Sequence, residues 1–133
     1  KEDVVQTTVC ELANEMLKDY KGPYCVESFH PIAVKWYKDN RPDIVRGQLA
    51  EAYWNKKDKK YHKFKFYLVS SLVTNVLTRP DFIAYDCVEY KNIPRKLTRL
   101  LGATQVTWTI KSKEQYEMLK DQYDYFIFDS CEL

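Results

Sequence analysis

Apolar residues along this chain recur in two rhythms that alternate with each other. Near the amino-terminal end they fall three or four positions apart, as on one face of a helix. The residues concerned are Val5, Val9, Leu12 and Met16. Lys21-Gly22-Pro23 comes next and ends this predicted helix, since proline cannot continue one.

Five short apolar runs have the other rhythm, which is that of buried strands. They cover residues 24–29, 44–49, 82–86, 105–110 and 125–129. Their apolar residues are continuous rather than alternating with polar ones. We therefore expect both faces of each strand to be covered, which is typical of a parallel sheet.

Helical patterns occupy the stretches between these strands. One helix is expected to begin at His30-Pro31, because proline suits the first helical turn. Pro94 opens another, with Gly102 as its C-terminal cap, and Ser112 with Gln115 forms a capping box for the last. A longer helical region has one apolar stripe, made of Phe64, Leu68, Leu72 and Val76.

The alternation of strands and helices predicts an α/β fold with helices packed outside a parallel sheet. No stretch reads as a linker, so we expect a single domain over residues 1–133.

Composition and charge exclude several classes of protein. With 45% hydrophobic and 30% charged residues, the 133-residue chain is not of the disordered or fibrous kind. A formal net charge of +2 is too small to argue for a nucleic-acid partner. No apolar run approaches the roughly 18 residues of a membrane span. The first residues enter a charged helical pattern directly, so we expect no signal peptide.

The four cysteines are widely spaced and include no C-x-x-C pair, which argues against a zinc site. They are Cys10, Cys25, Cys87 and Cys131. We expect buried free thiols in a reducing compartment, and hence a cytoplasmic location.

Candidate functional residues gather at the carboxyl ends of the predicted strands, where α/β proteins bind their ligands. They are Glu27, Ser28, Phe29, His30, Gln48, Tyr85, Asp86, Trp108, Thr109, Lys111 and Asp129. These residues either line a pocket or mark where each strand meets water, and the pattern alone favours neither reading.

His30 has a chemical and a structural interpretation. An imidazole after a strand could be a general base, but the position before a helix proline favours an ordinary linking residue. Ser28, His30 and Asp86 could form a Ser-His-Asp set, yet no G-x-S-x-G turn supports it. The basic, aromatic segment Lys56–Lys65 either contacts phosphate groups or forms a solvated helix face, and the balanced charge elsewhere favours the helix face.

An ordered set of motifs resembles the glycerophosphodiester phosphodiesterase family. Residues 27–31, Glu-Ser-Phe-His-Pro, resemble its Ser-Phe strand end, and residues 106–110, Val-Thr-Trp-Thr-Ile, resemble its late Trp-Thr strand. Residues 41–43, 46–49 and 79–85 are similar to intervening segments of a bacterial subgroup, and residues 123–128 to the family's last strand. Each motif is short, but their order is kept along nearly the whole chain.

The resemblance implies an α/β fold that is the C-terminal half of a TIM-type (β/α)8 barrel, with parallel strands and outer helices. The family consists of phosphoric diester hydrolases that convert glycerophosphodiesters to an alcohol and glycerol phosphate. They use a divalent metal, calcium or magnesium, held by carboxylates, and two histidines as acid and base. By analogy, Trp108 packs against the glycerol moiety, and the other predicted substrate-binding residues are Glu27, Ser28, Phe29 and Gln48.

The family's catalytic and metal-binding motifs belong to an earlier half of the barrel, and none occurs in this sequence. We therefore predict no catalytic residue and no metal ligand here. The chain alone should be inactive, and should pair with a missing N-terminal half or with itself. The alternatives are a non-catalytic half-barrel interaction module and a weak anionic-ligand binder through Lys56–Lys65.

The number of strands conflicts with an eight-stranded barrel. Five strands here and four expected in the earlier half make nine, so one segment should lie outside the barrel. Residues 82–86 are the first candidate.

Overall fold

The computed structural model describes residues 2–51, 73–89 and 93–130. Over these residues it contains one five-stranded parallel sheet, with the strands in chain order. The strands are β1 (Cys25–Ser28), β2 (Val45–Ala50), β3 (Phe82–Asp86), β4 (Thr104–Ile110) and β5 (Tyr125–Phe128). The α-helices are α1 (Glu2–Leu17), α2 (Pro31–Asn40), α4 (Asn75–Thr78), α5 (Ile93–Leu100) and α6 (Lys113–Leu119).

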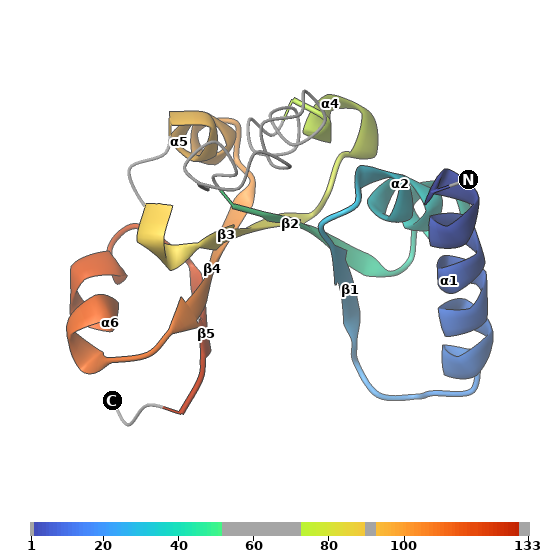
Figure 1. Cartoon of the computed structure of the whole chain (residues 1–133), viewed down its shortest axis with the longest axis horizontal. Helices are drawn as coiled ribbons and strands as arrows, with labels where there is room; N and C mark the ends of the chain where they lie inside the picture. The colour runs from blue at the N-terminus through green and yellow to red at the C-terminus, as the bar shows by residue number, and fades with distance from the viewer. Residues whose placement is uncertain (1, 52–72, 90–92, 131–133) are drawn as a thin grey trace.

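The sheet curls, with β1 and β5 at its two ends and the helices along its outer side (Figure 1). A short 3₁₀ helix, η3 (Cys87–Glu89), follows β3. This arrangement is half of a TIM-type barrel, so the predicted fold class is confirmed.

The segment that we expected outside the barrel lies at the centre of the sheet. Strand β3 pairs with β2 through Gly47 to Phe82 and with β4 through Phe82 to Thr104. Ile83, Ala84 and Tyr85 are at most 1% exposed. The expectation was wrong because it assumed four strands in the earlier half. An eight-stranded barrel that includes all five strands has room for three more.

The structure contains the predicted start of the helix at Pro31 and the predicted glycine after the helix that ends near residue 100. Pro31 begins α2, and the His30 side chain caps it by accepting a bond from the Ile32 N–H. Gly102 follows α5 with a φ of +86°, a conformation that favours glycine. The long helical region predicted around Phe64, Leu68 and Leu72 lies outside the described residues, as do residues 56–65; α4 contains Val76.

The capping box of α6 differs by one residue from the prediction. The Ser112 hydroxyl accepts a bond from the Gln115 N–H at 3.3 Å, as expected. The Gln115 side chain, however, accepts from the Lys111 N–H at 2.8 Å rather than from Ser112. Both bonds satisfy main-chain donors at the start of the helix.

The core lies between the sheet and the helices, in three clusters of buried residues. One joins Cys10, Ala33, Tyr37 and Ile44; the second joins Ala50, Ile83 and Tyr85; the third joins Cys87, Ile110, Leu119 and Tyr123. Burial raises the pKa of the Cys10 and Cys87 thiols. Cys25 is exposed, contrary to expectation, because its side chain lies on the uncovered side of β1. Cys131 lies outside the described residues.

Two buried arginines are held by local partners. Arg46 of β2 lies 3.4 Å from the Asp81 carboxylate and donates to the Arg79 carbonyl at 3.0 Å. The Arg95 guanidinium lies over the Tyr123 ring, 4.4 Å from its centroid. The first contact fastens the loop before β3 to β2, and the second fastens the loop before β5 to α5. Among the described helices, none has the length and apolar content required to cross a bilayer.

Replacing Ser112 with alanine should lower the free energy of unfolding by about 1 kcal/mol, because the Gln115 N–H loses its acceptor. Urea unfolding followed by circular dichroism measures this change. Ser112→Asn retains an acceptor and should remain within about 0.5 kcal/mol of the unaltered chain. An equal loss in both variants would contradict the capping role.

Candidate functional site

The concave side of the sheet forms an open hollow of about 520 Å³. Alternate residues of the strands point into it, since successive side chains of a strand face opposite sides. The lining residues are Cys25, Glu27, Val45, Asp81, Phe82, Thr104, Val106, Tyr125 and Ile127. Apolar groups predominate, and Tyr125 is 64% exposed. The hollow is therefore an apolar surface that faces solvent in the described part of the chain.

Two aromatic side chains meet at the carboxyl-terminal rim of the sheet, outside the set of residues that line the hollow. The rings of Phe29 and Trp108 lie edge to face, with centroids 5.6 Å apart and an interplanar angle of 85°. The Trp108 indole N–H donates to the Ala84 carbonyl at 3.0 Å, which fixes the ring over β3. Phe29 comes from the end of β1 and Trp108 from β4, so residues 79 positions apart in the chain share one rim.

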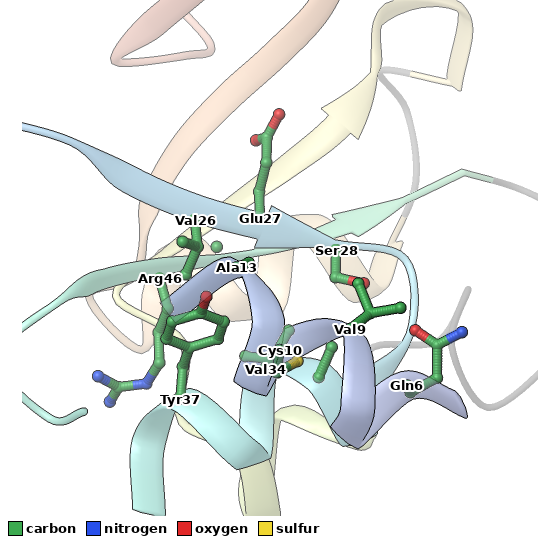
Figure 2. A pocket seen from close by; sticks show the side chains of 12 residues that line it. Gln6, Val9, Cys10, Ala13, Val26, Glu27, Ser28, Val34, Tyr37 and Arg46 are labelled. Carbon is green, nitrogen blue, oxygen red and sulfur yellow. The ribbon is translucent and has the colours of Figure 1, made fainter. Parts of the chain in front are cut away.

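Glu27 lies on the same concave side, two residues before Phe29. Figure 2 shows its carboxylate on the side of β1 that faces away from α1. Partial burial raises the pKa of Glu27 above its usual value, because desolvation disfavours the charged form. The Glu27 carboxyl group thus lies against a largely apolar surface.

Ser28 and Gln48 lie beneath the rim, on the helix-covered side. The Gln48 side chain is fully buried, and its amide donates to the carbonyls of Ser28 at 3.0 Å and Phe29 at 3.2 Å. The Ser28 hydroxyl accepts a bond from the His30 N–H at 3.0 Å. These bonds hold the end of β1 in place, so Ser28 and Gln48 position Phe29 in this structure.

The Ser-His-Asp set considered above does not assemble. The His30 imidazole caps α2, and the Ser28 hydroxyl bonds to the main chain of His30 rather than to its ring. Asp86 accepts a bond from the Val88 N–H at 2.9 Å. Each of the three side chains therefore has a local structural partner.

Within residues 2–51, 73–89 and 93–130, no three His, Cys, Asp or Glu side chains come together as a metal site requires.

Sequence reasoning missed several residues of the hollow, including Phe82, Tyr125 and Ile127. Phe82 and Tyr125 begin β3 and β5, so they lie at the amino ends of strands, where no candidate was sought. Continuous apolar runs also do not show which residues face which side. The structure pairs Gly47 with Phe82, so these two residues face the same side of the sheet. An added Cβ at Gly47 would lie 2.1 Å from the Phe82 ring, so the glycine makes room for this ring.

Comparison of the sequence with models of known protein families finds no match, and comparison with curated proteins finds none either. The structure is similar to that of a phosphodiesterase from Oleispira antarctica, solved in complex with the product sn-glycerol-3-phosphate. The TM-score is 0.68 and the sequence identity 14%. The similarity covers 93% of this chain and 46% of that one, so the chain spans about half the length of its structural neighbour. At this identity the likeness establishes a shared fold.

Replacing Glu27 with glutamine should stabilise the chain at pH 7. Because the folded state raises the pKa of Glu27, it binds this proton more tightly than the unfolded state does. The charged carboxylate of Glu27 therefore lowers the stability of the folded state. This loss of stability is absent at low pH. It develops as the pH rises, first through the pKa of Glu27 in the unfolded state and then through its higher pKa in the folded state. The advantage of the variant should therefore vanish below about pH 4. Urea unfolding at both pH values measures this.

Glu117→Gln is the matched control. Lys120 lowers the pKa of Glu117, so this substitution should be neutral or slightly destabilising at pH 7. The same stabilisation in both variants would point to a general charge effect and contradict the role given to Glu27.

Proposed function

We propose that this chain is the C-terminal portion of a glycerophosphodiester phosphodiesterase, which hydrolyses glycerophosphodiesters to an alcohol and glycerol phosphate. The observation that carries the proposal is the shared fold with a phosphodiesterase over 93% of this chain and 46% of the other. The ordered motifs of the sequence support the same family independently of that fold.

The chain supplies one wall of the proposed substrate site. Phe29 and Trp108 meet at the rim, where their apolar faces can pack against the carbon atoms of a glycerol moiety. Glu27 adds a carboxylate on the same side of β1, suited to a hydroxyl or to a cationic head group. Ser28 and Gln48 act through Phe29, since their hydrogen bonds fix the strand end that carries it.

In this proposal the catalytic groups are supplied by parts of the enzyme other than the described residues of this chain. Enzymes of this class use calcium or magnesium to neutralise phosphate oxygens. The described residues offer no cluster that fits such a metal. In this proposal the metal ligands and the acid–base histidines belong to the rest of the barrel, and the chain by itself is inactive.

The location proposed for the protein is the cytoplasm, with a role in lipid metabolism. Cys10, Cys25 and Cys87 are free thiols, as is usual in a reducing compartment.

The second candidate is a non-catalytic module that uses the open concave side as an interaction surface. Its supporting observation is the exposed apolar hollow of the described residues. Anion binding through Lys56–Lys65 is a further alternative; it requires affinity that falls steeply as salt is added.

A chimera tests the enzymatic proposal. The part of the Oleispira antarctica phosphodiesterase outside the matched region would be joined ahead of this chain. The purified chimera should release glycerol phosphate from glycerophosphocholine in calcium or magnesium and lose this activity in a chelator. Phe29→Ala and Trp108→Ala should each raise KM about 3- to 10-fold, the worth of one aromatic contact.

Tyr20→Ala is the control, because Tyr20 is an exposed aromatic residue in the loop that leads to the opposite end of β1. A folded chimera that hydrolyses nothing with either metal would rule out the enzymatic proposal and favour the interaction module.

A further inference from the structure

Helix α5 packs against the rest of the protein with its polar side. Arg95 is 2% exposed, lies over the Tyr123 ring and donates to the Gln122 carbonyl at 3.3 Å. Thr98 donates to the Arg95 carbonyl at 2.8 Å and accepts a bond from the Gln105 side chain at 3.3 Å. Gln105 belongs to β4, so these polar contacts hold α5 against the sheet and against the loop before β5.

The apolar side of α5 faces solvent in the described part of the chain. Ile93, Leu97 and Leu100 are spaced by four and three residues, so they form one stripe along the helix. Leu101 continues the stripe in the turn that follows. These four side chains are 79%, 55%, 84% and 79% exposed, in chain order, and we call them the α5 patch. A helix on a sheet normally buries its apolar side, so α5 has the opposite arrangement.

The α5 patch lies apart from the surfaces that a completed barrel would close. Helix α5 connects β3 to β4 and runs along the outer side of the sheet (Figure 1). Strands β1 and β5 form the two edges of the described sheet. The rest of a barrel would meet these edges and enclose the concave hollow. It would therefore leave the α5 patch uncovered.

The charged residues of α5 indicate which kind of surface fits the patch. Within Ile93–Leu100, three residues are basic and none is acidic; the basic ones are Arg95, Lys96 and Arg99. Lys96 is exposed and lies three residues from Ile93 and four from Leu100, hence beside the stripe. Arg99 is also exposed, although it donates to the Gln122 carbonyl. Apolar residues bordered by basic ones are typical of helices that lie in the interface of an anionic bilayer.

Helix α1 shows how much the charge matters. Its apolar stripe is likewise exposed, at 58%, 55%, 61% and 85% for Val5, Val9, Leu12 and Met16. Within Glu2–Leu17, however, no residue is basic and four are acidic, namely Glu2, Asp3, Glu11 and Glu15. An anionic surface would repel this helix. Helix α1 also lies at the β1 end of the sheet, where the rest of a barrel would cover it (Figure 1).

We propose that α5 docks this protein on the surface of an anionic lipid bilayer. The α5 patch enters the boundary between head groups and acyl chains, and Lys96 and Arg99 lie against lipid phosphates. A second copy of this chain fits less well, because pairing two α5 helices would bring their basic residues together. The inference goes beyond the proposed function and does not depend on it.

Vesicle flotation of the whole chain tests the proposal. Binding should be stronger to vesicles of phosphatidylcholine with phosphatidylglycerol than to phosphatidylcholine alone, and should weaken as salt is added. The double variant Leu97→Gln/Leu100→Gln should bind the anionic vesicles at least about 10-fold more weakly, because two leucines no longer leave water. Lys96→Gln should weaken this binding about 5-fold and leave the neutral vesicles unaffected.

Leu12→Gln/Met16→Gln on α1 is the matched control. These side chains are 61% and 85% exposed, close to the 55% and 84% of Leu97 and Leu100. Loss of binding in the α5 variant alone supports the proposal. No preference for anionic vesicles, or equal loss in both double variants, overturns it. Binding that survives the α5 variant would place the contact elsewhere, as on Lys56–Lys65, and would also overturn it.

Unfolding and sedimentation of the α5 double variant test the other occupants. Glutamine keeps the helix propensity of leucine, so replacing exposed side chains should leave the urea midpoint nearly unchanged. A midpoint lower by about 1 M or more would mean that another part of this chain covers the patch. A dimer of the unaltered chain that disappears in the variant would make a second copy the occupant. Either result overturns the proposal.

Discussion

The parallel pairing of β1 to β5 is the constraint on which every other feature of this protein depends. Parallel strands need helical connections, and these connections cover the outer side of the sheet. The same pairing brings all carboxyl ends to one edge, where Phe29 and Trp108 meet although they are far apart in the chain. Among the described residues no helix covers the concave side, so the lining of the hollow faces solvent there.

Alternation along the strands divides the candidate site into two layers. At the end of β1, the side chains of Glu27 and Ser28 point to opposite sides of the sheet, Glu27 to the concave side and Ser28 to the helices (Figure 2). The Phe29 ring packs against Trp108. Gln48 of the neighbouring strand lies in the helix-side layer and bonds to the carbonyls at the end of β1. The residues of the concave-side layer can therefore contact a ligand, while those of the helix-side layer hold the concave-side residues in position. A buried side-chain amide such as that of Gln48 suits this positioning role, because moving it away from its main-chain partners would leave a buried polar group without hydrogen bonds, which costs free energy.

Three surfaces of the described residues are uncovered. The exposed stripe of α1, the free edge of β1 and the concave hollow are different kinds of surface, one helical, one main-chain and one formed by strand side chains. Additional strands and helices of a barrel would cover all three at once. A small ligand would cover part of a hollow and leave the edge and the stripe exposed.

The sequence by itself determined the type and order of the elements. Apolar periodicity identified α1 and all five strands, and Pro31, Gly102 and Ser112 marked helix ends because their effects act within a few residues. It also placed Phe29 and Trp108 at strand ends. It could not show that Phe82–Asp86 is the central strand, because neighbours in a sheet are chosen by packing between distant segments. Nor could it show that Gln48 faces the helices or that the stripe of α1 is uncovered. Those facts depend on which side of each element meets another, and only the tertiary structure decides that.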